Sequence, residues 1–117
     1  MPLKSLTSSV LKWPDQAAVD AAARSWAEQQ KALHPELLRL GYFGSYARGD
    51  WGVGSDLDLI ALVQDSNLPF QERPLAWDLT TLPVPAEILI YTRAEWRRME
   101  REGGRFPASI RTEAIWL

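Results

Sequence analysis

The stretch that decides the fold runs from Gly41 to Val63 and reads GYFGSYARGDWGVGSDLDLIALV. Its last seven residues, LDLIALV, form an almost continuous apolar run that is typical of a strand buried on both faces. Two aspartates, Asp56 and Asp58, nevertheless stand at the start of this run. Aspartate is a poor strand former, and burying its carboxylate without a partner costs free energy. We therefore expect these two carboxylates to have a functional role.

The flanking sequence predicts a single small sheet covered by helices. A helical pattern follows Pro14 and ends at His34-Pro35, because a residue before proline is disfavoured in the α region. Thr92 and Glu95 have the spacing of a capping box, which predicts the start of another helix. These signals indicate an α/β (α+β) domain. The expected elements are a helix over 15–33, strands over 37–43, 57–63 and 87–92, a short helix within 70–82, a helix over 93–102, and a tail with a helical turn and a short strand.

Length and composition limit the function. A chain of 117 residues fits one domain, and we expect an N-terminal arm over 1–13 and the domain over 14–117. The absence of cysteine excludes disulfides, thiolate metal sites and thiol catalysis. A net charge of −2 argues against direct binding of nucleic acid. No membrane-length apolar run or secretory leader is evident, so the expected location is cytoplasmic.

Strand periodicity places the two aspartates on the same side of their strand. Paired carboxylates of this kind suit Mg²⁺ or Mn²⁺, which keep waters and substrate phosphates as their other ligands. Glu87 begins the third predicted strand and can supply a further carboxylate if that strand is a neighbour. Asp78 is the alternative third acid. Upstream, Gly44-Ser45 follows a strand and opens a helical turn, where free backbone N–H groups favour phosphate.

The pattern G-S-x(10)-D-x-D, formed by Gly44, Ser45, Asp56 and Asp58, resembles the signature of the nucleotidyltransferase superfamily that includes DNA polymerase β. The segment GSYARGDWGVGSDLDL most resembles the minimal nucleotidyltransferase (MNT) domains of that superfamily. The similarity extends from about residue 15 to the C-terminus. It implies the nucleotidyltransferase fold, a small mixed sheet flanked by helices, as a single minimal domain.

The resemblance also implies roles for individual residues. Two Mg²⁺ ions, with Mn²⁺ as a substitute, would be bound by Asp56, Asp58 and Glu87, and Glu87 would help to take the proton of the acceptor hydroxyl. The family usually has aspartate at the third position, so Glu87 is a departure from its pattern. Phosphates of ATP or another nucleoside triphosphate would be held by Gly44, Ser45 and Arg48.

The implied activity is transfer of a nucleoside monophosphate, AMP from ATP, to a hydroxyl. So small a domain has no second half to hold an acceptor, and similar proteins pair with a HEPN-domain toxin whose tyrosine they adenylylate. An antitoxin with a HEPN-type partner is therefore the leading hypothesis. The alternatives are O-nucleotidyl transfer to a small molecule such as an aminoglycoside, with a homodimer completing the pocket, and a partner-binding antitoxin module without catalysis.

Simpler interpretations exist for several of these residues. The segment GVGSD can form a turn in which Ser55 and Asp56 bond only to the local backbone. Arg48 can pair with Asp50 alone. Trp51 can stack on a base or, as we favour, pack against the protein. The arginines of the helix after Thr92 are typical of a solvated helix face.

Overall fold

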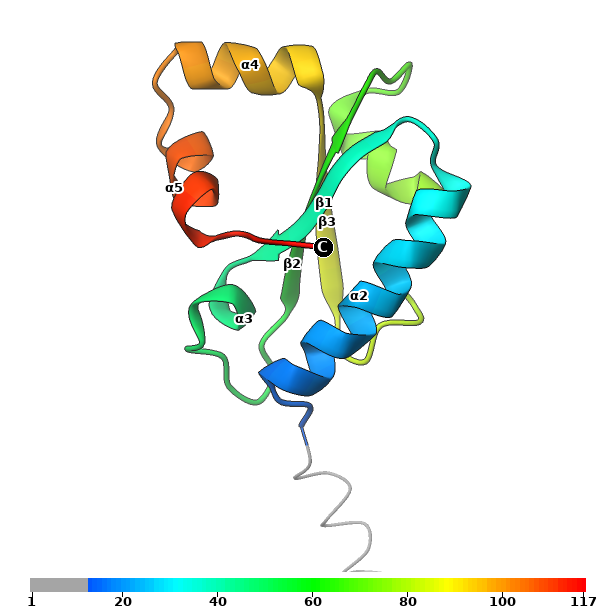
Figure 1. Cartoon of the computed structure of the whole chain (residues 1–117), viewed down its shortest axis with the longest axis vertical. Helices are drawn as coiled ribbons and strands as arrows, with labels where there is room; N and C mark the ends of the chain where they lie inside the picture. Colours follow the sequence, from blue (N-terminus) through cyan, green and yellow to red (C-terminus); the bar gives the residue numbers. More distant parts are fainter. Residues whose placement is uncertain (1–12) are drawn as a thin grey trace, which may run out of the picture.

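The structure is a computed structural model that describes residues 13–117, and these residues form one mixed sheet with helices on both faces (Figure 1). The predicted fold class is confirmed. The predicted arm lies outside the described residues except for Trp13, whose indole donates a hydrogen bond to the hydroxyl of Tyr46 at 2.7 Å. The elements are α2 (Gln16–Leu33), β1 (Leu37–Phe43), α3 (Ser45–Arg48), β2 (Leu57–Val63), the 3₁₀ helix η1 (Phe70–Ala76), β3 (Ala86–Thr92), α4 (Arg93–Arg101), α5 (Arg105–Glu113) and β4 (Ile115–Trp116).

The sheet has the strand order β3-β2-β1-β4. β1 runs antiparallel to both of its neighbours, whereas β2 and β3 are parallel. The predicted neighbourhood of the second and third long strands is thus confirmed. The parallel register pairs Asp58 with Glu87, and the antiparallel register pairs Asp58 with Phe43. This register brings the end of β1 and the starts of β2 and β3 to one end of the sheet.

The alternation of side chains along β2 divides the core into two layers. Leu57, Leu59, Ala61 and Val63 pack with α2, whereas Ile60 and Leu62 pack with α4 and α5. Asp58 has the same parity as Ile60, so its side chain lies on the face covered by α4 and α5. The sheet therefore directs the predicted acidic side chains toward α5 rather than toward α2. Three tryptophans of helical segments are buried, as expected: Trp26, Trp77 and Trp96.

Helix α2 begins where Asp15 accepts a hydrogen bond from Ala18 N at 2.9 Å, and it ends at His34. Pro14 precedes this N-cap and lies outside the first turn of the helix. Along α2, Val19 and Trp26 are buried, whereas Leu33 is 69% exposed. Leu33 lies in the last turn of α2, at the end of the contact between helix and sheet.

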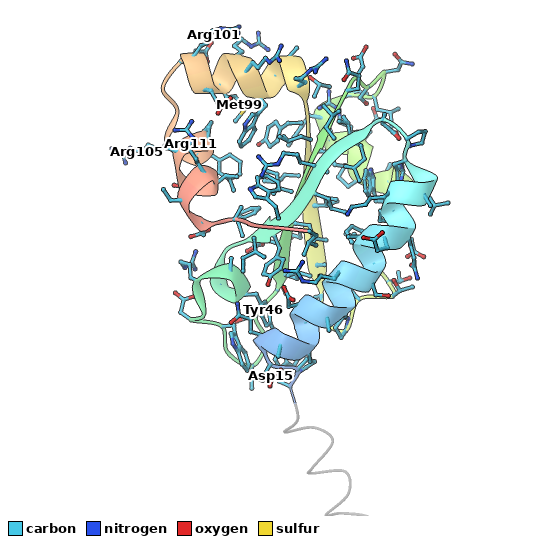
Figure 2. All side chains as sticks on the ribbon, viewed as in Figure 1. Asp15, Tyr46, Met99, Arg101, Arg105 and Arg111 are labelled. Carbon is cyan, nitrogen blue, oxygen red and sulfur yellow. The ribbon has the colours of Figure 1, made fainter. Side chains whose placement is uncertain are left out.

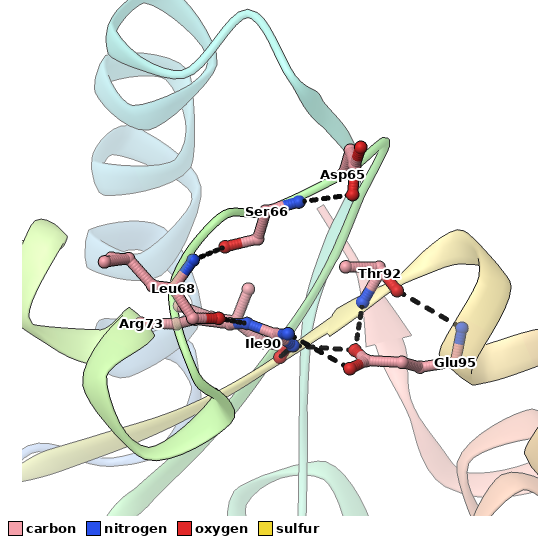
Figure 3. A network of polar contacts seen from close by, with 7 residues as sticks. All are labelled: Asp65, Ser66, Leu68, Arg73, Ile90, Thr92 and Glu95. Carbon is pink, nitrogen blue, oxygen red and sulfur yellow. Dashed lines mark hydrogen bonds and ion pairs between the residues drawn. The ribbon is translucent and has the colours of Figure 1, made fainter.

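A buried ion pair ties η1 to the start of α4 (Figure 3). Arg73, only 7% exposed, donates to both carboxylate oxygens of Glu95 at 2.6 and 3.0 Å and to the carbonyl of Ile90 at 2.9 Å. Glu95 also completes the capping box with Thr92, which confirms the predicted helix start. The side-chain hydrogen bond from Arg73 is the main cause that lowers the pKa of Glu95 to about 2. The ionised form of Glu95 is therefore favoured by the folded state.

The outer surface of α4 and α5 is basic. Figure 2 shows Met99 on the side of α4 that faces the sheet and Arg101 on the opposite side, in agreement with the packing of Met99 against the core. The exposed arginines confirm the predicted solvated face: Arg93, Arg97, Arg98 and Arg101. None of the helices within residues 13–117 combines the length and apolar character needed to cross a membrane.

Candidate active site

Three strands bring Gly44, Asp58 and Glu87 together at one end of the sheet. Gly44 directly follows β1 and has a φ of +77°, a conformation that residues with a Cβ rarely adopt. A Cβ on Gly44 would overlap the Oδ2 atom of Asp58, so glycine is required for the close approach of this backbone to the carboxylate. Glu87 is the direct cross-strand partner of Asp58. The sequence thus correctly placed these residues near one another.

Asp58 lies where burial and neighbouring negative charges disfavour its ionised form. Its pKa is raised first by burial and then by the negative charges of Glu87 and Asp56, and the positive charge of Arg48 only partly offsets these effects. Asp56 precedes β2 and is exposed, as is Glu87, whereas Asp58 is half-buried. A raised carboxyl pKa beside two further acids means that the site favours an added positive charge.

The donor set fits a divalent metal ion by its chemistry, because carboxylate oxygens on neighbouring strands are the ligands that Mg²⁺ and Mn²⁺ prefer. Within residues 13–117, however, no three His, Asp or Glu side chains stand close enough together to hold one metal ion. Metal binding by Asp56, Asp58 and Glu87 stays a prediction.

The predicted phosphate segment is a single helical turn, α3, that the core holds firmly. Tyr46 is fully buried, and its ring stacks on Trp51 with centroids 5.6 Å apart and planes 8° apart. The role that we favoured for Trp51, packing against the protein, agrees with this contact. Ser45 begins the turn and is half-buried, next to Gly44. The backbone at Gly44-Ser45 therefore has a fixed position relative to Asp58.

Arg48 pairs with Asp50, as the simpler interpretation held, but it also reaches a residue that the sequence reasoning missed. Its Nε donates to Asp50 at 3.1 Å and its Nη1 to Glu113 at 3.1 Å. The second carboxylate oxygen of Glu113 accepts a hydrogen bond from Gly44 N at 2.8 Å. Glu113 is the sole acidic residue after Gly104, and this is the one signal that the sequence contained.

Two other features do not belong to the site. The alternative acid, Asp78, accepts hydrogen bonds from the backbone and hydroxyl of Thr80 in an exposed turn. A surface hollow of about 450 Å³, lined among others by Val63, Arg73 and Trp77, lies at the opposite end of β2 from Asp58. His34 covers one face of Trp77 there, with ring centroids 3.8 Å apart.

A comparison with known families identifies the family to which this domain belongs. A family model described as a nucleotidyltransferase domain matches residues 24–105, more than half of the chain and the whole of β1, β2 and β3. The chain belongs to the nucleotidyltransferase family. Among solved structures, a "putative nucleotidyltransferase" from Sulfolobus solfataricus has the same fold, with a TM-score of 0.61 and 17% identity over 86% of this chain and 80% of that one. No curated protein matches this nucleotidyltransferase significantly.

Proposed function

We propose that this nucleotidyltransferase transfers AMP from ATP to a hydroxyl, and that the hydroxyl belongs to a tyrosine of a HEPN-type toxin partner. One observation carries the catalytic half of the proposal: Asp58 lies in register with Glu87 and in contact distance of the Gly44 backbone. Carboxylates and a phosphate-binding backbone are thereby adjacent on a rigid sheet. Nucleotidyl transfer is the general activity of the family to which the chain belongs.

The reaction exchanges a phosphoanhydride bond of ATP for a phosphoester bond to the acceptor. The acceptor oxygen attacks the α-phosphorus of ATP, the bond from this phosphorus to the β-phosphate bridging oxygen breaks, and pyrophosphate leaves with that oxygen. Glu87, the exposed acid of the pair, accepts the proton of the acceptor hydroxyl. Gly44, Ser45 and Arg48 hold the β- and γ-phosphates, so that the leaving group stays fixed while the bond breaks.

Asp56, Asp58 and Glu87 would hold the magnesium ions that this chemistry requires. When bound, such ions stabilise the charge that develops on the entering and leaving oxygens. The raised pKa of Asp58 supports this assignment, since neighbouring negative charges make a cation favourable there. The HEPN partner is supported by the resemblance of the segment GSYARGDWGVGSDLDL to MNT domains.

A second candidate is a partner-binding antitoxin without transfer activity. One observation favours it: within the described part of the chain, the acids do not stand as a ready-made metal cluster. The two candidates differ in what happens to the partner. Under the first, the partner gains a covalent AMP group. Under the second, it is bound and chemically unchanged.

The test is incubation of the chain with ATP labelled at the α-phosphate, Mg²⁺ and a HEPN-domain protein encoded beside it. We expect label on a tyrosine of the partner, lost with Asp58→Asn and kept with Asp78→Asn. The second variant is a matched control because it neutralises an exposed aspartate outside the site. Tight binding without label would favour the non-catalytic module, and label on an added aminoglycoside alone would favour small-molecule transfer.

A further inference from the structure

The carboxylate of Glu113 already occupies two of the three residues to which the phosphates are assigned, Gly44 and Arg48. Its Oε2 accepts from the backbone N–H of Gly44 at 2.8 Å, and its Oε1 accepts from Nη1 of Arg48 at 3.1 Å. The contact joins residues 69 positions apart in the sequence. In the fold, the segment that leaves α5 passes next to α3 (Figure 1).

A carboxylate that bridges a backbone amide and a guanidinium presents two anionic oxygens to two donors. A phosphate group presents the same kind of oxygens, and arginine binds carboxylate and phosphate with similar geometry. Arg48 also donates from its Nε to Asp50. A phosphate that approaches Gly44 and Arg48 together must therefore take the place of Glu113.

The charge of Glu113 opposes the nucleotide in a second way. Its negative charge acts on Asp58, on the same face of the sheet as Asp56 and Glu87. A triphosphate that enters this end of the sheet thus meets four carboxylates, with Arg48 as the neighbouring cation. Removing one of these charges lowers the repulsion as well as freeing the donors.

The position of Glu113 in the chain fixes where its carboxylate can go. Glu113 is the last residue of α5, and β4 follows after one residue. β4 is tightly seated, because a Cβ on Gly41 would stand 2.6 Å from the carbonyl oxygen of Ile115. The guanidinium of Arg39 also lies 3.8 Å from the ring centre of Trp116. The backbone is therefore held on both sides of Glu113, and rotation of its side chain is the simplest route to release.

We propose that Glu113 is an internal competitor of the nucleotide: its carboxylate closes the phosphate site until a triphosphate displaces it. This inference rests on the proposed function, because it concerns the phosphate site of the same reaction. It adds a residue from the C-terminal helix that regulates access to that site.

The test measures binding of inorganic tripolyphosphate by calorimetry in the presence of EDTA, so that no metal contributes. We expect Glu113→Gln to bind about fivefold more tightly than the wild type, because the variant removes the negative charge that competes for Gly44 and Arg48. Glu100→Gln is the matched control. It removes a carboxylate paired with an arginine at the same 3.1 Å, but on α4. We expect its affinity to stay within twofold of the wild type.

A second readout follows the backbone amide of Gly44 by nuclear magnetic resonance. Tripolyphosphate should shift this amide in the wild type and in both variants, and the saturating concentration should fall only in Glu113→Gln. Because glutamine can still accept from Gly44 N, the variant is expected to fold, and circular dichroism checks this. Glu113→Ala removes the acceptor as well and should bind at least as tightly as Glu113→Gln.

Three binding results would overturn the proposal. Weaker binding by Glu113→Gln would show that Glu113 positions Arg48 for the phosphate rather than competing with it. An equal gain in Glu100→Gln would reduce the effect to net charge. No binding by any variant would remove the phosphate site on which the competition depends. AMP transfer by the wild-type chain is measured separately. If the wild type transfers AMP but the affinity for tripolyphosphate is unchanged in Glu113→Gln, the competitor is refuted and the proposed function stands.

Discussion

The buried pair of Arg73 and Glu95 allows a quantitative prediction of how stability depends on pH. The pKa of Glu95 falls from 4.5 to about 2 on folding, because its carboxylate is bound by Arg73 and by the backbone N–H of Thr92. A depressed carboxyl pKa stabilises the folded state above the unfolded value, and this contribution is lost as the pH falls from 4.5 toward 2. At 1.36 kcal/mol per unit, the contribution at pH 7 is about 3 kcal/mol.

The perturbation is Glu95→Gln, which leaves the guanidinium of Arg73 buried without its charged partner. We expect the free energy of unfolding in urea to fall by about 3 kcal/mol at pH 7, and the gap to the wild type to shrink by about half at pH 3. Glu100→Gln breaks an exposed pair with Arg111 and should lose less than about 1 kcal/mol, without such convergence. Equal stability of Glu95→Gln and wild type at pH 7, or a gap independent of pH, would refute this reasoning.

Three further substitutions test the site itself. Burial and neighbouring acids raise the pKa of Asp58, so its charge destabilises the folded state at neutral pH. Asp58→Asn should therefore melt at an equal or higher temperature than the wild type, while its rate of transfer falls about 100-fold or more. Gly44→Ala should lose transfer activity. Its free energy of unfolding should fall by at least twice the roughly 1 kcal/mol lost by Gly49→Ala, since both glycines have positive φ but only Gly44 abuts a carboxylate. Gly41→Ala should speed hydrogen exchange of β4 amides, whereas Gly52→Ala, with open space around it, should not. A lower melting temperature of Asp58→Asn, equal losses in the two alanine variants at 44 and 49, or unchanged exchange in Gly41→Ala would contradict these expectations.

The features of the fold that the sequence predicted are those that local patterns determine. The apolar run Leu57–Val63 is β2, and its parity places Asp58 on the face of the sheet that α5 covers. The capping box of Thr92 and Glu95 predicted where α4 begins, since both of its hydrogen bonds join residues three apart. We also expected β2 and β3 to be adjacent, and the in-register pairing of Asp58 with Glu87 confirms this.

The features that the sequence could not predict depend on contacts between distant segments. Glu113 meets Gly44 only because β4 returns α5 to the edge of β1, and no periodicity records that return. Arg73 lies in a segment expected to be an ordinary short helix, yet its guanidinium is buried against Glu95, 22 residues away. Leu33 shows the converse, because its helical spacing is correct but no part of the sheet extends far enough to cover it.

The central claim is that the carboxylates at the start of β2 and β3 bind divalent metal ions beside the phosphates of a nucleotide. The most direct measurement is titration of Mn²⁺ followed by electron paramagnetic resonance, with a non-hydrolysable ATP analogue present. We expect two bound ions per chain in the wild type and in Asp78→Asn, and loss of both in Asp58→Asn. Equal Mn²⁺ binding by the wild type and Asp58→Asn, or no binding by the wild type, would contradict the account.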